Sequence, residues 1–584
     1  MDATFCFILD IMIQQTMSKS RGSWGSWFEF LFSALGSMVG LGNIWRFPYV
    51  CYRNGGGAFL IPFFVAMVVC GCPLLFLEML YCQYSNLGPG KVWIICPLFK
   101  GIGCGMMVIT FVVSVYYTMI MGWTLYYLTM SFSSKLPWVE HSTINSTHSR
   151  ADVGADLNTS TLSFNVSKSF VSAEETYWFQ NVLQVSPGIN TLGKISWPLL
   201  ICLFVSWLLV FLCLFKGIKS MGKVVYVAAT LPYVLLTILL IRGCLMPGSG
   251  NGLYYYMVPS WDKLLNFEVW RSAATQVFFS IGLGFGLIST LASYNKFHNN
   301  CYRDALILPV LDCVTSVYAG FVIFAYLGTM AHNLNVDVDK VVDEGPGLVF
   351  IAYPSALSTL PLPQLWSVLF FLMLFCVGLD SQFMHVQGVT TALLDCFPSV
   401  FKSRQTRLTL GLCLVSFLLG IPLCTQGGSY ILNLLDWYIA SFSVMLIVVI
   451  EVLVLAWIYG TECLYDDLQA MLGYRPCKVW VYFWKYLTPA FVLTLWTAGI
   501  VGFKTIGSVY PGYASWADGI GIFVAVLPIL PIPLKMIWTL AKLEGSFQQR
   551  LKQSIRPSPS WQPAVELELE EDFMICESGE LFKQ

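Results

Sequence analysis

Charged residues are scarce in this chain. Of its 584 residues, only 11% are Asp, Glu, Lys or Arg, whereas 57% are hydrophobic. That much apolar surface exceeds what folding alone can bury, so the composition excludes an ordinary soluble protein. The net charge of −1 and the lack of a basic face also argue against a nucleic-acid partner. We therefore expect a polytopic membrane protein that has the lipid bilayer as a partner.

Several functional motifs are also missing. No nucleophile paired with a base, no phosphate-binding loop and no metal cluster stands out, so an enzyme is not expected. The 19 cysteines mostly lie singly in apolar runs, which favours a packing role over metal or redox chemistry. The first residues lack the basic flank of a cleavable signal, so we expect the N-terminus in the cytosol.

Long apolar runs are what the chain has instead. A helix needs about 20 apolar residues to cross a bilayer. Twelve such segments are predicted, at residues 30–52, 58–83, 101–131, 196–215, 222–243, 269–294, 304–331, 363–395, 407–425, 430–460, 481–503 and 517–541. Residues 30–541 would form a twelve-span domain, between cytoplasmic tails at 1–29 and 542–584.

Lysine and arginine in the short connections set the orientation. The connections that carry these residues fall on one side of the predicted bundle, and the long connection 132–195 falls on the other. Because Lys and Arg mark the cytosolic side, we expect 132–195 outside the cell. It carries three glycosylation patterns, at Asn145, Asn158 and Asn165, as an outer loop of a plasma-membrane protein would. Both termini are then expected in the cytosol.

Two of the apolar segments are interrupted. The first contains Gly36-Ser-Met-Val-Gly40-Leu-Gly42-Asn43, and the sixth contains small residues between Gln276 and Gly286. Irregular backbone at membrane depth survives only where it lines a protein cavity, and the carbonyls that it frees can bind a small cation. Breaks at matching positions of two five-helix halves indicate an inverted-repeat transporter.

Specific motifs support the same interpretation. The stretches GLGNIWRFPYVCYRNGGGAFLIPF, YYTMIMGWTLYY, LASYNKFHNN, GLDSQF, TQGGSY and EGSFQQRL, which begin at residues 40, 116, 291, 378, 425 and 544, resemble the neurotransmitter:sodium symporter family. The likeness covers nearly the whole chain outside the tails and the outer loop, and is closest to the branch that carries glycine, proline, GABA and other amino acids. It implies an all-α protein of two inverted five-helix repeats, with broken first and sixth helices, plus two further helices.

The resemblance implies two sodium sites. The first would use the Met38 carbonyl and the side chains of Asn43, Ser280 and Asp312. The second would use carbonyls of the first and eighth segments with two side chains of the eighth: Gly36, Val39, Val377, Asp380 and Ser381. Several oxygen donors suit sodium, and Asp380 would be costly at membrane depth without a cation.

The substrate would lie beside the first sodium. Where the monoamine branch carries an aspartate, this chain has Gly40, so an amino-acid carboxylate can approach the sodium and the Tyr117 hydroxyl. His385 has two open interpretations, a hydrogen-bonded histidine between helices or a contact to the substrate. The implied pocket residues are Ser37, Gly40, Gly42, Val113, Tyr117, Phe279, Gly282, Phe285, Ser381 and His385.

Two charged pairs would gate the pathway. Arg46 with Asp436 would close the outer path, and Arg21, beside Trp24, would pair with Asp395 to close the inner one. A buried Arg–Asp pair adds little net stability, which suits a contact that breaks in every cycle. Glu78 and Tyr294 are candidate supports of the centre and the inner side.

The chain departs from the family at the chloride site. The family's tyrosine, glutamine and two serines correspond here to Phe63, Gln276, Ser280 and Ser316, and its sodium-site asparagine corresponds to Asp312. The carboxylate of Asp312 could balance the sodium charge without chloride, so chloride dependence is doubtful. The alternative is a protonated Asp312 that imitates asparagine.

The sequence thus predicts a sodium-coupled symporter of a small amino acid that works by alternating access, with sodium ions as coupling ions. The alternative is a family member that does not transport and serves as a trafficking or signalling partner. Retention of Asn43, Ser280, Asp380 and Ser381 argues against that alternative. A homo-oligomer is possible on the sequence alone.

Overall fold

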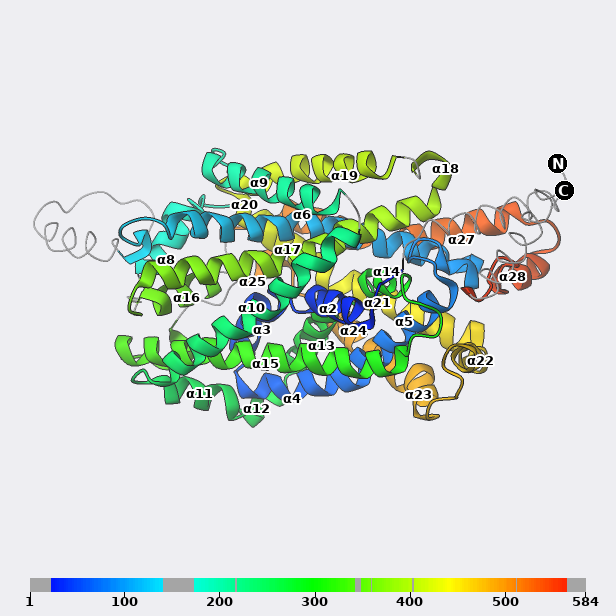
Figure 1. Ribbon diagram of the computed structural model, residues 1–584, viewed down its shortest axis with the longest axis horizontal. Coiled ribbons are helices and arrows are strands. Elements are labelled where there is room, and N and C mark those ends of the chain that lie inside the picture. The colour runs from blue at the N-terminus through cyan, green and yellow to red at the C-terminus, as the bar shows by residue number, and fades with distance from the viewer. Residues whose placement is uncertain are drawn as a thin grey trace, which may run out of the picture.

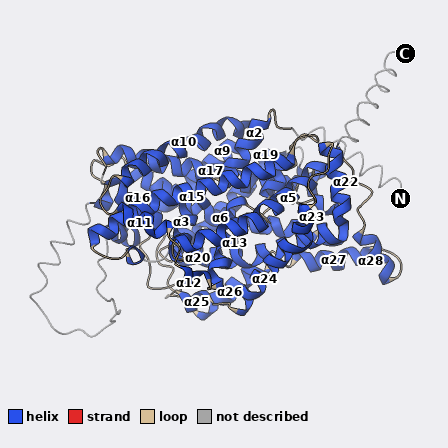
Figure 2. Ribbon diagram, turned by 90° about the horizontal axis from the view of Figure 1, so that it is seen from below, coloured by secondary structure: helices blue, strands red, loops and turns tan. Residues whose placement is uncertain are grey.

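The computed structural model describes residues 23–139, 173–215, 218–341, 348–358, 360–401, 404–510 and 512–564. Within these residues the protein consists of helices and loops, apart from one isolated antiparallel bridge between Ile195 and Thr425 (Figure 2). An all-helical chain satisfies its backbone hydrogen bonds within each segment, as a bilayer requires.

Helices cover all twelve of the segments expected from the sequence. The first five contain α2 (Trp27–Met38), η1 (Gly42–Arg46) and α3 (Phe47–Arg53), then α4 (Gly57–Ala66), η2 (Met67–Gly71) and α5 (Cys72–Ser85), then α6 (Gly101–Met130), α9 (Trp197–Leu214) and α10 (Ile218–Cys244). The next five contain α13 (Phe267–Ile281) and α14 (Leu287–Ala292), then α15 (Cys301–Leu334), α17 (Pro363–Cys396) and α19 (Gln405–Gly420), then α20 (Gly428–Tyr438), η9 (Ile439–Ser443), α21 (Val444–Leu453) and η10 (Val454–Gly460). The last two contain α23 (Val479–Tyr482), η11 (Phe483–Leu487) and α24 (Thr488–Val501), then α26 (Ser515–Val526) and α27 (Pro531–Lys542).

Short helices fill the connections. These are η3 (Val92–Ile95), η4 (Pro97–Phe99), α8 (Ala173–Thr176), η5 (Tyr177–Val182), α11 (Ser249–Met257), α12 (Trp261–Leu264), η6 (Val338–Lys340), α16 (Leu348–Ser358), α18 (Pro398–Phe401), η8 (Ile421–Cys424), α22 (Thr461–Leu472), α25 (Ile506–Val509) and α28 (Phe547–Ile555).

The number of membrane spans follows only in part from helix length. Seven of the described helices are long and apolar enough to cross a membrane, and nine if each of two sharply bent pairs counts as one span. The expected first and sixth segments fall short because each is divided into shorter helical pieces, whereas the eleventh is continuous from Val479 to Val501 but is not among the helices that are apolar enough. The protein is therefore a polytopic helical protein, while the count of twelve stays a prediction.

The two broken segments lie at the centre of the bundle. In Figure 1, α2 and α13 lie between α6 and α17 on one side and α15 and α4 on the other. Helix α2 packs against α10, α15 and α17, while α13 packs against α4 and α24. Side chains cap the starts of these helices: Ser26 Oγ accepts from the Glu29 N–H, and Asn266 Oδ1 accepts from the Glu268 N–H. Irregular backbone is thus enclosed by regular helices.

Candidate functional site

The side chain of Asn43 stabilises the backbone of the first interruption. Helix α2 ends at Met38, and the π-helical turn η1 starts at Gly42, so the break is narrower than the Gly36–Asn43 stretch expected. The Gly40 N–H donates to Asn43 Oδ1 at 3.1 Å and lies 2.9 Å from the Met38 carbonyl oxygen. Asn43 thereby satisfies one of the backbone N–H groups that the break exposes.

The second interruption depends on three glycines. Helix α13 continues to Ile281, past Gln276, and the break covers residues 282–286. Gly282, Gly284 and Gly286 have φ angles of 77°, 73° and 78°, a conformation that side chains disfavour. The carboxylate of Glu78 on α5 accepts from the Gly284 N–H and from Ser289 Oγ, both at 2.8 Å. Glu78 is therefore bonded to the middle of the second break and to α14, the helix that follows it.

Asp312 collects the side chains of the expected first sodium site. It comes from α15 and is fully buried. Asn43 Nδ2 donates to Asp312 Oδ1 at 2.7 Å, and Ser280 Oγ lies 2.8 Å and 3.0 Å from its two carboxylate oxygens. Residues 269 positions apart thus meet between the two breaks, and the carboxylate has hydrogen-bond donors on both oxygens.

Asp380 lies in a different environment. It is 3% exposed, and its Oδ1 has no hydrogen-bond partner among the described residues. A Cβ placed on Gly36 would lie 3.1 Å from Asp380 Oδ2, so this carboxylate faces the end of α2. The neighbouring Ser381 Oγ donates to the Ser37 carbonyl at 3.4 Å. A buried carboxylate oxygen without a partner is costly, which fits a site that a cation completes.

A small cavity of about 20 Å³ lies between the breaks, α6 and α17. It is lined by Ser37, Met38, Gly40, Gly42, Tyr117, Phe279, Ser280, Gly282, Phe285, Leu287, Ser381 and His385. All the predicted pocket residues are among them except Val113, which is fully buried but does not line the cavity. Leu287, which the sequence analysis missed, is the first residue of α14 and follows the second break directly.

Gly40 and Tyr117 shape the polar end of this cavity. A Cβ on Gly40 would collide with Ser381 Oγ and would lie 3.2 Å from the Tyr117 hydroxyl oxygen. An aspartate at this position would therefore require Ser381 and Tyr117 to move. The Leu41 N–H donates to the Tyr117 hydroxyl oxygen at 3.2 Å, which fixes the phenol at the first break.

His385 lies beside Tyr117 in the cavity wall. Its Nδ1 is 2.7 Å from the Ser381 carbonyl oxygen, one turn earlier on α17, and its ring centroid is 5.5 Å from that of Tyr117. Because a carbonyl only accepts, Nδ1 carries the hydrogen in this contact. His385 is thus hydrogen-bonded to its own helix while it also lines the cavity, so both interpretations stay open.

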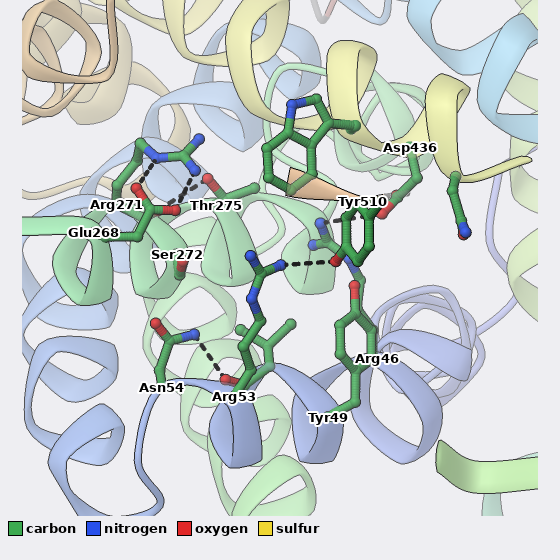
Figure 3. A pocket seen from close by; sticks show the side chains of 13 residues that line it. Arg46, Tyr49, Arg53, Asn54, Glu268, Arg271, Ser272, Thr275, Asp436 and Tyr510 are labelled. Atoms are coloured by element: carbon green, nitrogen blue, oxygen red, sulfur yellow. Dashed lines mark hydrogen bonds and ion pairs between the residues drawn. The ribbon is translucent and has the colours of Figure 1, made fainter. Parts of the chain in front are cut away.

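The outer pair meets above the cavity. Arg46 Nη2 lies 3.7 Å from Asp436 Oδ2, and the Tyr116 hydroxyl donates to Asp436 Oδ1 at 3.2 Å. Figure 3 shows the two side chains converging from the first segment and α20. The Arg46 guanidinium also lies 4.4 Å from the ring centroid of Phe279, which lines the cavity below. Arg46 therefore covers the Phe279 side of the cavity.

The side that is expected to face the cytosol has a different kind of contact. Trp24 Nε1 donates to the Leu291 carbonyl at 3.2 Å, and its ring packs edge-on against Tyr294. The Tyr294 hydroxyl lies 3.1 Å from Thr391 Oγ1 of α17. Asp395 accepts from the Gly88 N–H at 3.0 Å, whereas its expected partner Arg21 lies outside the described residues.

Of the residues expected to correspond to the chloride site, Phe63 makes an aromatic contact, whereas Ser316 and Gln276 form hydrogen bonds to residues of the first segment. Phe63 is fully buried, and its ring centroid lies 5.0 Å from that of Phe47, so an aromatic contact occupies the tyrosine position. Ser316 accepts from Asn43 Nδ2 at 2.8 Å, and Gln276 donates to the Gly42 carbonyl at 3.0 Å. The three predicted glycosylation positions, Asn145, Asn158 and Asn165, lie outside the described residues.

Comparisons with known proteins agree with this geometry. A family model described as the sodium:neurotransmitter symporter family matches residues 21–543. The chain belongs to this family. A sodium- and chloride-dependent glycine transporter 1 of Xenopus laevis is 44% identical over 561 residues, which cover 94% of this chain and 89% of the relative. A sodium- and chloride-dependent glycine transporter 2 of the same species is 40% identical over 580 residues, which cover 94% of this chain and 72% of the relative.

The symporter is thus a multi-pass membrane protein that couples sodium to the transport of a small amino acid. This confirms the family and the function predicted from the motifs. Its family and relatives are transporters, and the arrangement of carbonyls, hydroxyls and two buried carboxylates around a small cavity suits binding and release.

Proposed function

We propose that this symporter takes up glycine across the plasma membrane by alternating access, driven by sodium at two sites. The observation that favours glycine as the substrate is the small size of the central cavity, about 20 Å³. A cavity needs about 10–15 Å³ to hold one water molecule. Every amino acid would therefore require the wall to move, and glycine, the smallest, requires the least movement. The names of the relatives, which are glycine transporters, support the same substrate.

Two residues would limit the substrate from one side. Gly282 has a left-handed backbone, and a Cβ there would lie 3.2 Å from Leu287 Cδ1. Leu287 itself lines the cavity. A larger amino acid would have to displace Leu287 further than glycine would. The carboxylate of glycine would lie toward Gly40 and the Tyr117 hydroxyl.

Sodium would bind at both carboxylates. The first ion would be held by Asn43, Ser280, Asp312 and the Met38 carbonyl, and would lie beside the substrate carboxylate. The second would be held by Asp380, Ser381 and the carbonyls of Gly36, Val39 and Val377. The unpartnered Oδ1 of Asp380 supports the second site, and the convergence of Asn43 and Ser280 on Asp312 supports the first.

Alternating access would open one closure at a time. The Arg46–Asp436 pair at 3.7 Å would separate to admit substrate from outside. The contacts of Trp24 with Leu291 and Tyr294, together with an Arg21–Asp395 pair, would separate to release substrate inside. Because a buried ion pair adds little net stability, the outer closure can break without a large barrier.

Uptake into proteoliposomes tests this function. We expect a sodium gradient to drive accumulation of radiolabelled glycine, and choline in place of sodium to abolish it. Unlabelled alanine, proline and leucine should compete progressively less well as the side chain grows. Strong uptake of leucine or of a monoamine would contradict the proposed substrate, and glycine accumulation without sodium would contradict the coupling.

We also propose that chloride is dispensable, in contrast to what the names of the relatives state for those proteins. Phe63 brings an aromatic ring and no hydroxyl to the chloride position, and Asp312 brings a negative charge beside the first sodium site. At an effective dielectric constant near 20, a carboxylate in contact with sodium contributes several kcal/mol of Coulomb energy, about what a more distant chloride would.

Replacement of chloride by gluconate decides this point. We expect wild-type uptake to persist in gluconate, and Asp312→Asn to make uptake depend on chloride. Adding Phe63→Tyr to Asp312→Asn should strengthen the chloride dependence, because the tyrosine restores a hydroxyl donor. Collapse of wild-type uptake in gluconate would refute the proposal and favour a protonated Asp312.

A further inference from the structure

The chain continues past α28 along the ends of other helices. Residues 556–564, which we call the C-terminal strap, follow α28 directly. The backbone N–H of Ser558 donates to the Ile94 carbonyl oxygen of η3 at 2.9 Å, and Ala564 is only 2% exposed. Figure 1 shows α22 and α28 at one end of the molecule, opposite α8 and α16. The strap is thus docked on the end of the bundle that is expected to face the cytosol.

Trp561 anchors the strap. Its ring stacks on Tyr84 of α5, with centroids 5.5 Å apart, and packs edge-on against Tyr459 of η10. Trp561 Nε1 donates to the Tyr459 hydroxyl oxygen at 3.2 Å, and that hydroxyl donates to Asp467 Oδ2 of α22 at 2.7 Å. A buried aromatic pair with a satisfied indole N–H is typical of an anchor residue. The strap therefore joins the end of the second apolar segment to the end of the tenth.

A tight turn presents Ser558 beside this anchor. The Trp561 N–H donates to the Ser558 carbonyl oxygen at 2.8 Å, which closes a four-residue turn with Pro559 at its second position, where proline is favoured. Ser558 Oγ lies 2.9 Å from Ser560 Oγ. Ser558 is partly exposed, and Pro557 and Pro559 on either side of it are exposed. An enzyme from solution can therefore reach this hydroxyl.

The sequence around Ser558 is selective. A serine or threonine directly precedes a proline at three positions of the chain, Ser186, Thr488 and Ser558. Ser186 lies in the connection expected outside the cell, and Thr488 is the first residue of α24, inside an apolar segment. Proline lacks an N–H and has a fixed φ angle, so an enzyme that binds the residue after its acceptor must be shaped for it. Of the three positions, Ser558 alone lies where cytosolic ATP is available.

We propose that Ser558 is the acceptor of a proline-directed protein kinase, and that its phosphorylation detaches the C-terminal strap. The Ser558 hydroxyl oxygen attacks the γ-phosphorus of ATP, and the bond from that phosphorus to the bridging oxygen of ADP breaks. ADP leaves with the bridging oxygen, and the hydroxyl proton passes to the kinase's carboxylate base. The site rests on the expected cytosolic location of the strap, and only its effect on transport rests on the proposed function.

Phosphorylation would add negative charge beside an acidic helix. Helix α22 contains three carboxylates and no Lys or Arg. Arg475, which follows α22, contacts two of them, Glu462 and Asp466. The third, Asp467, accepts from the Tyr459 hydroxyl, to which the strap is bonded. A phosphoserine carries a charge of about −1.5 to −2 at pH 7 and disrupts contacts next to carboxylates by repulsion and desolvation. The anchor of the strap is therefore the contact that weakens.

Detachment would act on the inner side of the transporter. Helix α5 carries Glu78, which is bonded to the second break, and the strap joins the end of α5 to η10 through Tyr84 and Tyr459. Alternating access moves one group of helices against another. A strap that joins two helix ends restrains that movement. Phosphorylation of Ser558 should therefore raise the maximal transport rate.

Labelling with radioactive ATP tests the site without any transport measurement. The full-length protein in nanodiscs is incubated with a mitogen-activated protein kinase, and the labelled peptide is identified by mass spectrometry. We expect label at Ser558, lost in Ser558→Ala and in Pro559→Ala, whereas the matched control Ser560→Ala should be labelled like the wild type. Trp561→Ala should be labelled faster, because its turn is free to extend. Absence of label at Ser558 in both the wild type and Trp561→Ala would refute the site.

Hydrogen exchange measures whether the strap is docked. The amides of Ser558 and Trp561 are both hydrogen-bonded, so the peptide that contains them should be protected and should lose protection after phosphorylation. Ser558→Glu should lose protection as well, whereas Ser558→Gln, which has nearly the same size without the charge, should keep most of it. Equal protection before and after phosphorylation would overturn the switch, as would equal losses in Ser558→Glu and Ser558→Gln.

Uptake into proteoliposomes measures the consequence for transport. Trp561→Ala should raise the maximal rate roughly two- to tenfold, the scale of one aromatic pair, and kinase treatment should not raise it further. Phe547→Ala is the matched control, because Phe547 is an aromatic residue of the neighbouring α28 that is 67% exposed, and its rate should equal that of the wild type. An unchanged rate in a protein whose strap has detached by hydrogen exchange would contradict the restraint. Loss of transport in every variant would instead count against the proposed function, and labelling and exchange would still decide the site.

Discussion

The two buried aspartates, Asp312 and Asp380, differ in what surrounds them. Asp312 accepts hydrogen bonds from Asn43 and Ser280, and both of its oxygens have a donor. Asp380 has an oxygen without a partner among the described residues. Neighbouring side chains stabilise the first carboxylate, whereas no described residue donates a hydrogen bond to Oδ1 of the second. A carboxylate's depth in the membrane therefore says less about its role than its donors do.

The comparison predicts that the loss of Asp380 has the largest effect. Asp380→Ala should reduce sodium-driven glycine uptake to background, because the second ion would lose its only full charge. Surface biotinylation should show normal amounts of the variant. Ser367→Ala is the matched control, since Ser367 Oγ is also buried and unpartnered on α17, and its uptake should stay near that of the wild type. Undiminished uptake in Asp380→Ala would remove the second ion from the mechanism.

A smaller effect is expected at Tyr117, which lies between the two aspartates at the first break. Tyr117→Phe removes one charge-assisted hydrogen bond to the substrate carboxylate, worth about 1.5–3 kcal/mol. The apparent affinity for glycine should therefore fall roughly 10- to 100-fold. Concentration dependence of uptake measures this directly. Tyr116→Phe is a neighbouring control that should alter the gate through Asp436 and leave glycine affinity nearly unchanged, so equal losses in both variants would refute the assignment.

The smallest effect is expected at Asp312 when chloride is present. Asp312→Asn keeps the size of the side chain and an oxygen that can accept from Asn43 or Ser280. We expect uptake in chloride medium to fall by less than about tenfold, the scale of one neutral hydrogen bond. The measurement is the initial uptake rate beside that of Asp380→Asn, which should remain inactive. If both variants were equally inactive in chloride, the contrast between the two aspartates would be wrong.

The sequence predicted the parts of the site that depend on local chemistry. Three glycines within five residues weaken a regular helix at 282–286, by roughly 1 kcal/mol each relative to alanine, and allow the left-handed backbone that is found there. The motif around Asn43 likewise predicted its meeting with Ser280 and position 312, because the family resemblance supplies contacts between residues far apart in sequence. Both the breaks and the ring of pocket residues could therefore be named before the fold was known.

Other features depend on packing between distant helices. The sequence placed the start of the second break near Gln276, but α13 continues to Ile281 because Gly282 is the first residue in the left-handed conformation. Val113 is buried away from the cavity that Leu287 lines. A cavity of about 580 Å³ between α13, α20–α21, α24 and α26 had no signal in the sequence. Such a space depends on how the helices are tilted against one another, and no sequence motif encodes the tilt.

The small size of the central cavity also limits how much water each transport cycle can move. A space of about 20 Å³ holds on the order of one water molecule. An empty return of the carrier would then displace almost no solvent, so an osmotic gradient could perform almost no work on the cycle. Uptake into vesicles should accordingly be insensitive to impermeant sucrose on either side. The sodium gradient would then drive the movement of solute and not of water.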